Sequence, residues 1–321
     1  MIEEVIAQKE TLKPKQNETF EIIIIGSGPA GMSAAVCAKR ASFKVLMIDK
    51  AFPGGQLSTA YEISNYIGFK NPLGEDIASK MEDHILDLEI YYSCETVEDI
   101  IDIKGKVKTV LTDLGNKYKA NAIIIASGLE PKLLNTEFEK NFLGRGISYY
   151  AQSDIDTYKN EEVAVIGGGN CACYAANYLA KHVKQLYLIH QSDHLKAVKS
   201  LKEKVLSDEK IKLLWNSELT EVFGIDKVEK AKVRNISNNQ STWIDIKCIF
   251  IYAGRVPSEN ILNIELEVDE DGFIITDEMM RTNIDGVYAA GDIRVKQIRQ
   301  IATAISDGMI AAINIERDLF R

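Results

Sequence analysis

The feature that most constrains the fold is a glycine-rich turn that occurs twice. Residues 26–31 (GSGPAG) follow the β-branched run at 21–25 and lead into a predicted helix. Residues 167–172 (GGGNCA) follow a similar run at 162–166 and again lead into a predicted helix. Short, unbroken apolar runs are typical of parallel strands that are buried on both faces. The sequence therefore predicts an α/β protein with two strand–helix–strand units of the Rossmann type.

Two proline-containing segments divide the chain. Residues 126–131 (ASGLEP) and 253–257 (AGRVP) each follow an apolar run that is predicted to be a strand. The simplest arrangement has two Rossmann-like, three-layer nucleotide-binding domains, with the second inserted into the first. The expected inserted domain is 131–253. Residues 21–130 and 254–321, with a last helix expected over 297–317, form the first domain, and the polar residues 1–20 form an N-terminal extension.

Composition narrows the classes of function. The 321 residues carry a formal net charge of −9 at pH 7, which argues against a general binder of nucleic acid or anionic membranes. Apolar runs are far shorter than the roughly eighteen residues of a membrane-spanning helix, and five cysteines do not indicate an extracellular disulfide framework. No secretory signal is visible, so we expect a cytoplasmic protein. No cluster of histidines and cysteines has metal-ligand spacing, and no metal is expected.

The first glycine turn has the spacing of a dinucleotide site. Gly26 makes the tight turn, Gly28 lets the backbone approach a pyrophosphate, and Gly31 lets the helix pack closely on the strand. Asp49 follows Gly31 by eighteen residues, at the end of the next predicted strand, where an acid binds a ribose hydroxyl. The turn therefore predicts dinucleotide binding, and the alternative is a purely structural turn.

The second turn predicts another adenine dinucleotide site. It ends in Ala172, which is a permitted replacement for the third glycine. An NADP site would place arginines after the second strand to hold the 2′-phosphate, but Gln191 and Ser192 stand there. An NADP preference is therefore not supported, and a structural turn is again the alternative. The residues expected at this site are Gly167, Gly168, Gly169, Asn170 and His190.

Seven segments together resemble the low-molecular-weight thioredoxin reductase family, class II of the pyridine nucleotide-disulfide oxidoreductases. They follow the family's order along nearly the whole chain: 26–31 (GSGPAG), 54–57 (GGQL), 126–128 (ASG), 144–148 (GRGIS), 167–170 (GGGN), 286–292 (GVYAAGD) and 299–300 (RQ). The resemblance implies a homodimeric FAD protein with an inserted nucleotide domain.

The resemblance also implies which residues contact FAD. The pyrophosphate and ribose would be bound by the first turn and the acid that follows it, and the flavin by segments from both parts of the first domain. The implied residues are Gly26, Gly28, Pro29, Ala30, Gly31, Asp49, Gly55, Gln56, Asn65, Ala126, Gly128, Gly291, Asp292, Arg299, Gln300 and Ile301.

The chain departs from the family at its redox centre. The family carries Cys-Ala-Thr-Cys-Asp after the GRG segment, whereas this chain has YAQSD at 150–154, which keeps only the acid, Asp154. A serine cannot accept electrons from a flavin, so the family's reductase chemistry cannot run there. Some branches of the family take electrons from ferredoxin, and others hold a second flavin in the second nucleotide site.

We therefore expect an FAD-dependent oxidoreductase that does not use NADPH in the family's way. Electrons would come from a protein donor such as ferredoxin or flavodoxin, or from another flavin, and would pass to a disulfide, with Cys171 and Cys173 as the candidate pair. The inserted domain would hold a second FAD or NADH. The alternatives are an NAD(P)H-dependent reductase without a disulfide, of the ferredoxin–NADP reductase type, and a catalytically silent flavoprotein that acts as a redox sensor.

Cys171 and Cys173 form the remaining cysteine pair of interest. They lie in the first turn of the second predicted helix, where the helix dipole lowers a thiol pKa. Helical periodicity places Cys171 on an apolar stripe with Ala175, and Cys173 on a polar stripe with Asn177. Packing would then explain Cys171 but not Cys173. The pair is a redox hypothesis, and two small packing residues are the alternative.

Overall fold

The computed structural model describes residues 11–257 and 265–319. The chain forms two compact units: the first contains the described residues up to Glu130 and from Val256 onward, and the second spans Pro131–Arg255. The second unit is thus inserted into the first. Of the expected N-terminal extension, residues 1–10 lie outside the described part, as do 258–264 and 320–321 of the expected first domain.

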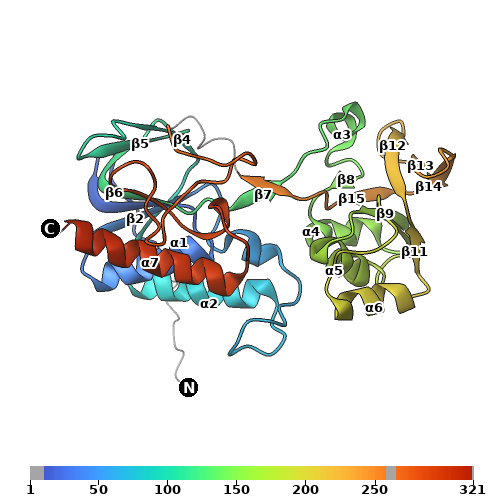
Figure 1. Cartoon of the computed structure of the whole chain (residues 1–321), viewed down its shortest axis with the longest axis horizontal. Coiled ribbons are helices and arrows are strands. Elements are labelled where there is room, and N and C mark those ends of the chain that lie inside the picture. Colours follow the sequence, from blue (N-terminus) through green and yellow to red (C-terminus); the bar gives the residue numbers. More distant parts are fainter. Residues whose placement is uncertain (1–10, 258–264, 320–321) are drawn as a thin grey trace, which may run out of the picture. The chain divides into compact units, whose positions relative to one another are not determined.

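The first unit is built on a seven-stranded sheet (Figure 1). Its strands are β1 (Thr19–Ile25), β2 (Val45–Asp49), β3 (Tyr91–Cys94), β4 (Val97–Ile101), β5 (Lys108–Thr112), β6 (Lys117–Ile125) and β17 (Val287–Ala289). Their order is β3-β2-β1-β6-β5-β4, and β17 pairs with β6. The strands β3, β2, β1, β6 and β17 run parallel, whereas β4 and β5 form an antiparallel extension.

Side chains alternate across β1 and fill a core on each face of the sheet. Ile22 and Ile24 pack with the helices on one face, and Ile23 and Ile25 pack on the other. The helices and 3-10 turns of this unit are α1 (Pro29–Arg40), η1 (Gly55–Thr59), α2 (Gly74–Asp87), η4 (Gly291–Ile293) and α7 (Ile301–Leu319). Helices α1 and α7 lie side by side (Figure 1). Because β1 is buried on both faces, its unbroken isoleucine run is explained.

Glu95 is a buried acid of the first unit. It lies between β3 and β4 and accepts hydrogen bonds from Ser93, Thr112, Asn116 and Tyr118. Burial raises the pKa of this carboxyl, but the hydrogen bonds outweigh that effect and hold its pKa below the ordinary value. Glu95 is therefore a charged group whose partners stabilise this edge of the sheet.

The chain passes between the units through two short strands. These are β7 (Leu129–Pro131) and β16 (Arg255–Pro257), which pair with each other. The amide of Lys132 also donates to the carbonyl of Gly254 at 3.0 Å. Both crossings are therefore held together by backbone hydrogen bonds.

The second unit contains a parallel sheet and an antiparallel sheet. The five-stranded parallel sheet has the order β11-β10-β9-β15-β8, and the three-stranded antiparallel sheet has the order β12-β13-β14. The strands are β8 (Ile147–Ser148), β9 (Glu162–Ile166), β10 (Gln185–Ile189), β11 (Ile211–Leu214), β12 (Ser217–Phe223), β13 (Lys230–Asn235), β14 (Ser241–Asp245) and β15 (Cys248–Ile251).

Helices and the antiparallel sheet cover opposite faces of this parallel sheet. Val163 and Val165 of β9 pack with the helices, whereas Ala164 packs with Ala231 and Val233 of the antiparallel sheet. The helices and turns are α3 (Glu137–Phe142), α4 (Ala151–Asp154), η2 (Ile155–Tyr158), α5 (Asn170–Leu179) and α6 (Lys199–Ser207). Each unit is thus a mixed α/β structure of three layers, as the sequence predicts.

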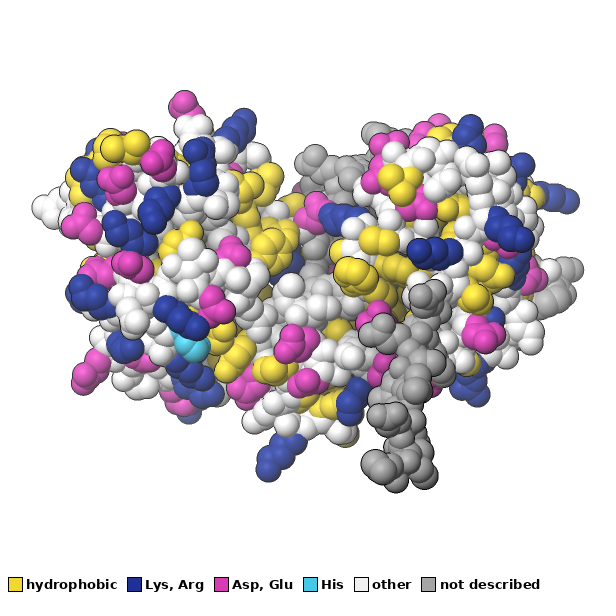
Figure 2. Space-filling view, turned by 180° about the vertical axis from the view of Figure 1, so that it is seen from behind, with side chains coloured by type: hydrophobic (Ala, Val, Ile, Leu, Met, Phe, Trp, Pro, Cys, Tyr) yellow, Lys and Arg dark blue, Asp and Glu magenta, His cyan; other side chains and the backbone are white. Residues whose placement is uncertain are grey.

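Two observations concern the outside of the molecule. No helix within residues 11–257 and 265–319 is long and apolar enough to cross a membrane. Figure 2 shows lysine and arginine side chains interspersed with aspartate and glutamate over the face that it draws.

Candidate functional site

The first glycine turn forms an open cradle at the carboxyl end of β1. A Cβ atom on Gly26 would lie 2.3 Å from the carbonyl oxygen of Ala126, and one on Gly31 would lie 1.9 Å from that of Gly26. A Cβ atom on Gly28 would have nothing within 4 Å, and the φ of Gly28 is −72°. Neither packing nor backbone strain requires glycine at position 28. The position is open, so a ligand could approach the backbone there.

The residues around this cradle fit a pyrophosphate. Gly28 caps α1 without a side-chain hydrogen bond, Pro29 occupies the first turn, and that turn holds no acidic residue. The first-turn N–H groups and the helix dipole therefore remain directed at an anion. The hydroxyl of Ser127, beside Gly26, is buried without a hydrogen-bond partner among the described residues. A ligand at this position would supply one.

Asp49 lies next to the cradle, at the end of β2. Its Oδ2 accepts from the amide of Ser27 at 2.6 Å and from the hydroxyl of Ser27 at 2.8 Å. Its Oδ1 accepts from the amide of Ala51 at 3.2 Å. The carboxylate is thus held in place beside the turn, where the sequence predicts a ribose contact.

The segments expected beside a flavin also gather in the first unit. The side-chain amide of Gln56 donates to the carbonyl of Leu129 at 2.7 Å and lies against Gly128, and a Cβ atom on Gly55 would lie 3.2 Å from the Cα of Gly28. The Nδ2 of Asn65 donates to the Oε1 of Gln300 at 2.8 Å. Residues that are 235 positions apart therefore meet at one place.

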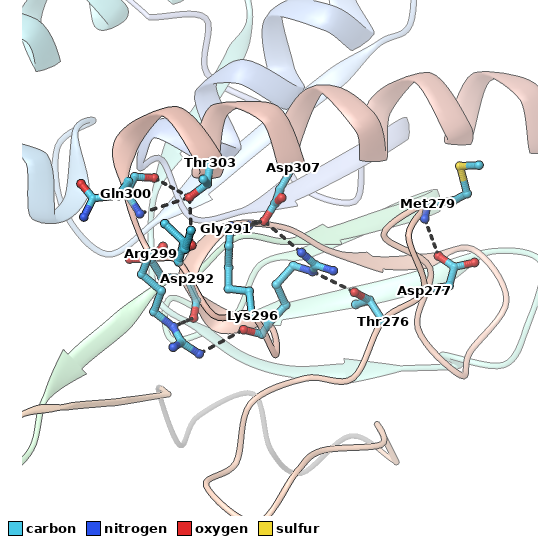
Figure 3. Close-up of polar contacts among 12 residues, drawn as sticks. Thr276, Asp277, Met279, Gly291, Asp292, Lys296, Arg299, Gln300, Thr303 and Asp307 are labelled. Atoms are coloured by element: carbon cyan, nitrogen blue, oxygen red, sulfur yellow. Dashed lines mark hydrogen bonds and ion pairs between the residues drawn. The ribbon is translucent and has the colours of Figure 1, made fainter. Parts of the chain in front are cut away.

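The turn at Gly291 and Asp292 is fixed from two sides (Figure 3). On one side, the amide of Gly291 donates to Oδ2 of Asp307 in α7 at 3.1 Å. On the other, Arg299 donates to the carbonyl of Asp292 at 3.2 Å, and its guanidinium lies 4.0 Å from the ring centroid of Phe273. Helix α7 begins at Ile301, four residues later than the start expected from the sequence.

Sequence reasoning missed Asp307 and Lys296. The ammonium of Lys296 lies 2.7 Å from Oδ2 of Asp307, and both side chains are only 9% exposed. A signal was present, because Asp307 interrupts the buried stripe of Ala304, Gly308 and Ala311. An acid inside an apolar helix face indicates a buried polar contact.

The second glycine turn repeats the conformation of the first. Gly169 caps α5 with φ −84° and ψ −176°, and Gly28 caps α1 with φ −72° and ψ −176°. A Cβ atom on Gly167 would lie 2.5 Å from the carbonyl oxygen of Tyr252, but one on Gly169 would again have nothing within 4 Å. The second unit therefore has its own open cradle, and the first turn of α5 holds no acidic residue.

His190 packs against this second cradle. A Cβ atom on Gly168 would lie 2.4 Å from the Cε1 of His190. The hydroxyl of Ser192 donates to the carbonyl of His194 at 2.9 Å, so it must accept its 2.8 Å hydrogen bond from the Nε2–H of His190. Burial lowers the pKa of His190. The imidazole is therefore neutral near pH 7 and carries no charge for a phosphate.

Asp154, the acid retained from the family's redox segment, ends the short helix α4. Its Oδ1 accepts from the hydroxyl of Ser153 at 2.9 Å. The segment holds no cysteine, so no disulfide can form within it.

The structure contradicts the stripes assigned to Cys171 and Cys173. Cys173 is fully buried and packs with Ala176 and Leu179, whereas Cys171 is exposed. Burial raises the pKa of Cys173 to about 11. The assignment was wrong because the buried face of α5 is wide: it includes Cys173 with Ala172 and Ala176 as well as Ala175 and Leu179, whereas Cys171, in the first turn, is exposed. Packing thus explains Cys173, and the redox hypothesis loses the argument that favoured it.

Comparison with known proteins places these features in a family. Residues 20–308 match the model of the pyridine nucleotide-disulphide oxidoreductases. The chain belongs to this family. It is 38% identical to the thioredoxin reductase of Listeria monocytogenes over 94% of each chain. It superposes on the crystal structure of Lactococcus lactis thioredoxin reductase with a TM-score of 0.90 and 34% identity, covering 94% of this chain and 99% of that one.

The name of a further relative includes ferredoxin, an electron-carrier protein. The ferredoxin-flavin thioredoxin reductase of Clostridium acetobutylicum is 29% identical, with a TM-score of 0.52, over 94% of this chain and 99% of that one. This chain is an FAD-dependent oxidoreductase of the thioredoxin reductase type. Its residues 150–154 (YAQSD) contain no cysteine.

Proposed function

We propose that the first unit binds FAD and that the second unit binds a dinucleotide without a 2′-phosphate, either NADH or a second FAD. The observation that carries the second part is the open Gly169. Its φ of −84° suits any residue, and no atom lies within 4 Å of the position that a Cβ would take. A structural turn would tolerate serine there, since serine is a better helix cap than most residues.

The surroundings of His190 support a nucleotide other than NADP. The positions after β10 hold a neutral histidine, Gln191 and Ser192, and Ser192 already uses its proton on the carbonyl of His194. Lys196 is the one lysine or arginine between residues 185 and 198. A single flexible cation is a poor substitute for the bidentate hydrogen bonds that arginines make to a phosphate.

Bound FAD supplies two-electron transfer, and the described residues define what surrounds it. The cradle of Gly28 and the first turn of α1 would hold the pyrophosphate, Asp49 would orient the ribose, and the Gly291–Asp292 turn would contact the ribityl chain. No disulfide can form within residues 150–154. The electron path of this chain therefore differs from that of thioredoxin reductases with a disulfide at this segment.

The donor that we propose is a protein such as ferredoxin or flavodoxin, as in the Clostridium relative, with NADH as the competing donor. The acceptor would be a disulfide of a partner protein. A path through Cys171 and Cys173 is the weaker version, because Cys173 is buried. We also propose a homodimer, which light scattering tests as a native mass near twice 35.8 kDa.

Two measurements test the proposal. The extracted FAD per chain distinguishes one flavin from two, and anaerobic bleaching distinguishes the donors. We expect NADH or a reduced ferredoxin to bleach the flavin, and micromolar NADPH to do so slowly. Rapid bleaching by NADPH would contradict the nucleotide assignment. If none of these donors reduces the flavin, the alternative of a catalytically silent flavoprotein that acts as a redox sensor would be favoured.

A further inference from the structure

A buried charge cluster lies beneath the Gly291–Asp292 turn. Oδ2 of Asp307 lies 2.7 Å from the ammonium of Lys296 and 3.5 Å from Nη1 of Arg294. The side chains of Asp307 and Lys296 are 9% exposed, and that of Arg294 is 14% exposed. Arg294 also donates from Nε to the hydroxyl of Thr276 at 2.8 Å. Figure 3 shows Asp307 projecting from α7 toward Gly291.

The same carboxylate fixes the backbone of the turn. The amide of Gly291 donates to Oδ2 of Asp307 at 3.1 Å, in addition to the bond from Lys296. Gly291 has φ +83°, and a Cβ atom on it would lie 2.8 Å from the Cβ of Ala30. The turn is thus confined between α1 and α7, and its amide direction is set by Asp307.

Stability alone does not account for such a cluster. A buried ion pair is often no more stable than well-packed apolar residues of the same volume. Helix α7 packs here through Ala304, Gly308 and Ala311, which are small apolar residues or glycine. A directed carboxylate does what an apolar residue cannot: it holds one peptide N–H, and with it the next residue, in one orientation.

We propose that Asp307 is a positioning residue for the cofactor: by binding the amide of Gly291 it orients Asp292 toward the ribityl–pyrophosphate region of FAD. This inference rests on the proposed FAD site in the first unit. Lys296 and Arg294 face the carboxylate of Asp307 and balance its charge. Asp307 itself does not touch the flavin and acts through the turn.

The test uses the Asp307→Asn variant as the purified holoprotein. The amide keeps the size of the side chain but removes the charge from the bond to Gly291. We expect the release of FAD, followed by the recovery of free-flavin fluorescence, to be about 10 times faster, as when a hydrogen bond to a charged group becomes one to a neutral group. Glu316→Gln removes an exposed carboxylate from the same helix and should leave the rate unchanged.

A double-mutant cycle separates positioning from a structural role. If Asp307 acts through Asp292, the two residues are energetically coupled. The effects of Asp307→Asn and Asp292→Asn on the release rate will then be less than multiplicative. Multiplicative effects, or no acceleration in Asp307→Asn, would overturn the inference. The visible circular dichroism of the flavin that remains bound should also change in Asp307→Asn.

A second variant covers the case in which Asp307→Asn fails to fold. Lys296→Gln leaves the bond between Asp307 and Gly291 in place, and Arg294 still faces the carboxylate at 3.5 Å, so we expect it to release FAD at close to the wild-type rate. Clearly faster release of FAD from Lys296→Gln than from the wild type would show that the charge cluster, and not the bond to the turn, controls FAD release. A wild-type protein that holds no FAD would contradict the proposed function itself, which is a different outcome from any of these.

Discussion

Replacing Gly28 with serine separates folding from cofactor binding. Gly28 has φ −72° and ψ −176°, and nothing lies within 4 Å of an added Cβ. Serine caps helices about as well as glycine or better, by a few tenths of a kcal/mol. The stability of the flavin-free protein should therefore change by less than about 1 kcal/mol.

Binding should respond very differently in this variant. The new side chain occupies the space that a pyrophosphate needs to reach the first-turn N–H groups of α1. Hydrogen bonds to charged groups contribute about 1.5–3 kcal/mol each. Loss of two such bonds weakens FAD binding by about two to four orders of magnitude. The Gly28→Ser protein should purify nearly colourless, with a normal far-UV circular dichroism spectrum.

The second unit supplies a matched control. Gly169→Ser makes the same change in nearly the same backbone conformation, and it should leave the flavin of the first unit in place. Gly31→Ala shows the opposite behaviour, because its Cβ would lie 1.9 Å from the carbonyl oxygen of Gly26, so folding itself should suffer. Full FAD content in Gly28→Ser would refute the assignment of this turn as the pyrophosphate site.

Three further predictions follow from single groups. Glu95 has a lowered pKa, so its stabilisation is present above its unfolded pKa of about 4.5 and is lost as the pH falls through its folded pKa. Urea unfolding should show Glu95→Gln destabilised by about 1–3 kcal/mol at pH 7, with a smaller difference at pH 3. At pH 8, Cys171 should react with Ellman's reagent without prior reduction, whereas Cys173 should react only after unfolding; protection of Cys171 until reduction would support the disulfide. Gln191→Arg with Ser192→Arg should tighten NADPH binding at least about tenfold by calorimetry. Unchanged NADPH affinity would contradict the inference that the missing arginines disfavour the 2′-phosphate.

The backbone of both units was predictable because glycine patterns report backbone geometry directly. The β-branched runs before Gly26 and Gly167 are the central strands β1 and β9, as predicted. The resemblance to the thioredoxin reductases, based on segments from 26 to 300, is confirmed by the family match over residues 20–308. Element ends were less predictable: α7 begins at Ile301 instead of residue 297.

Side-chain environments were less predictable, since they depend on contacts between distant segments. The stripe argument for Cys171 and Cys173 failed because the buried face of α5 is wide enough to include Cys173, while Cys171 is exposed in the first turn. The acid at position 307 was passed over because its partners, Gly291 and Lys296, are contributed by a separate loop. Periodicity identifies an apolar stripe, but the orientation of a ten-residue helix in alanine-rich sequence is fixed by packing.

The two cradles show why the location of a nucleotide is easier to infer than its identity. Gly28 and Gly169 differ by 12° in φ and have the same ψ, so either can admit a pyrophosphate, which all of these dinucleotides share. Identity depends on the few side chains at the next strand end. In the first unit that residue is the acid Asp49, and in the second it is the neutral His190, whose tautomer is set by Ser192. In our proposal, the hydroxyl of Ser192 and the absence of arginine at positions 191 and 192 together disfavour a 2′-phosphate at the second cradle.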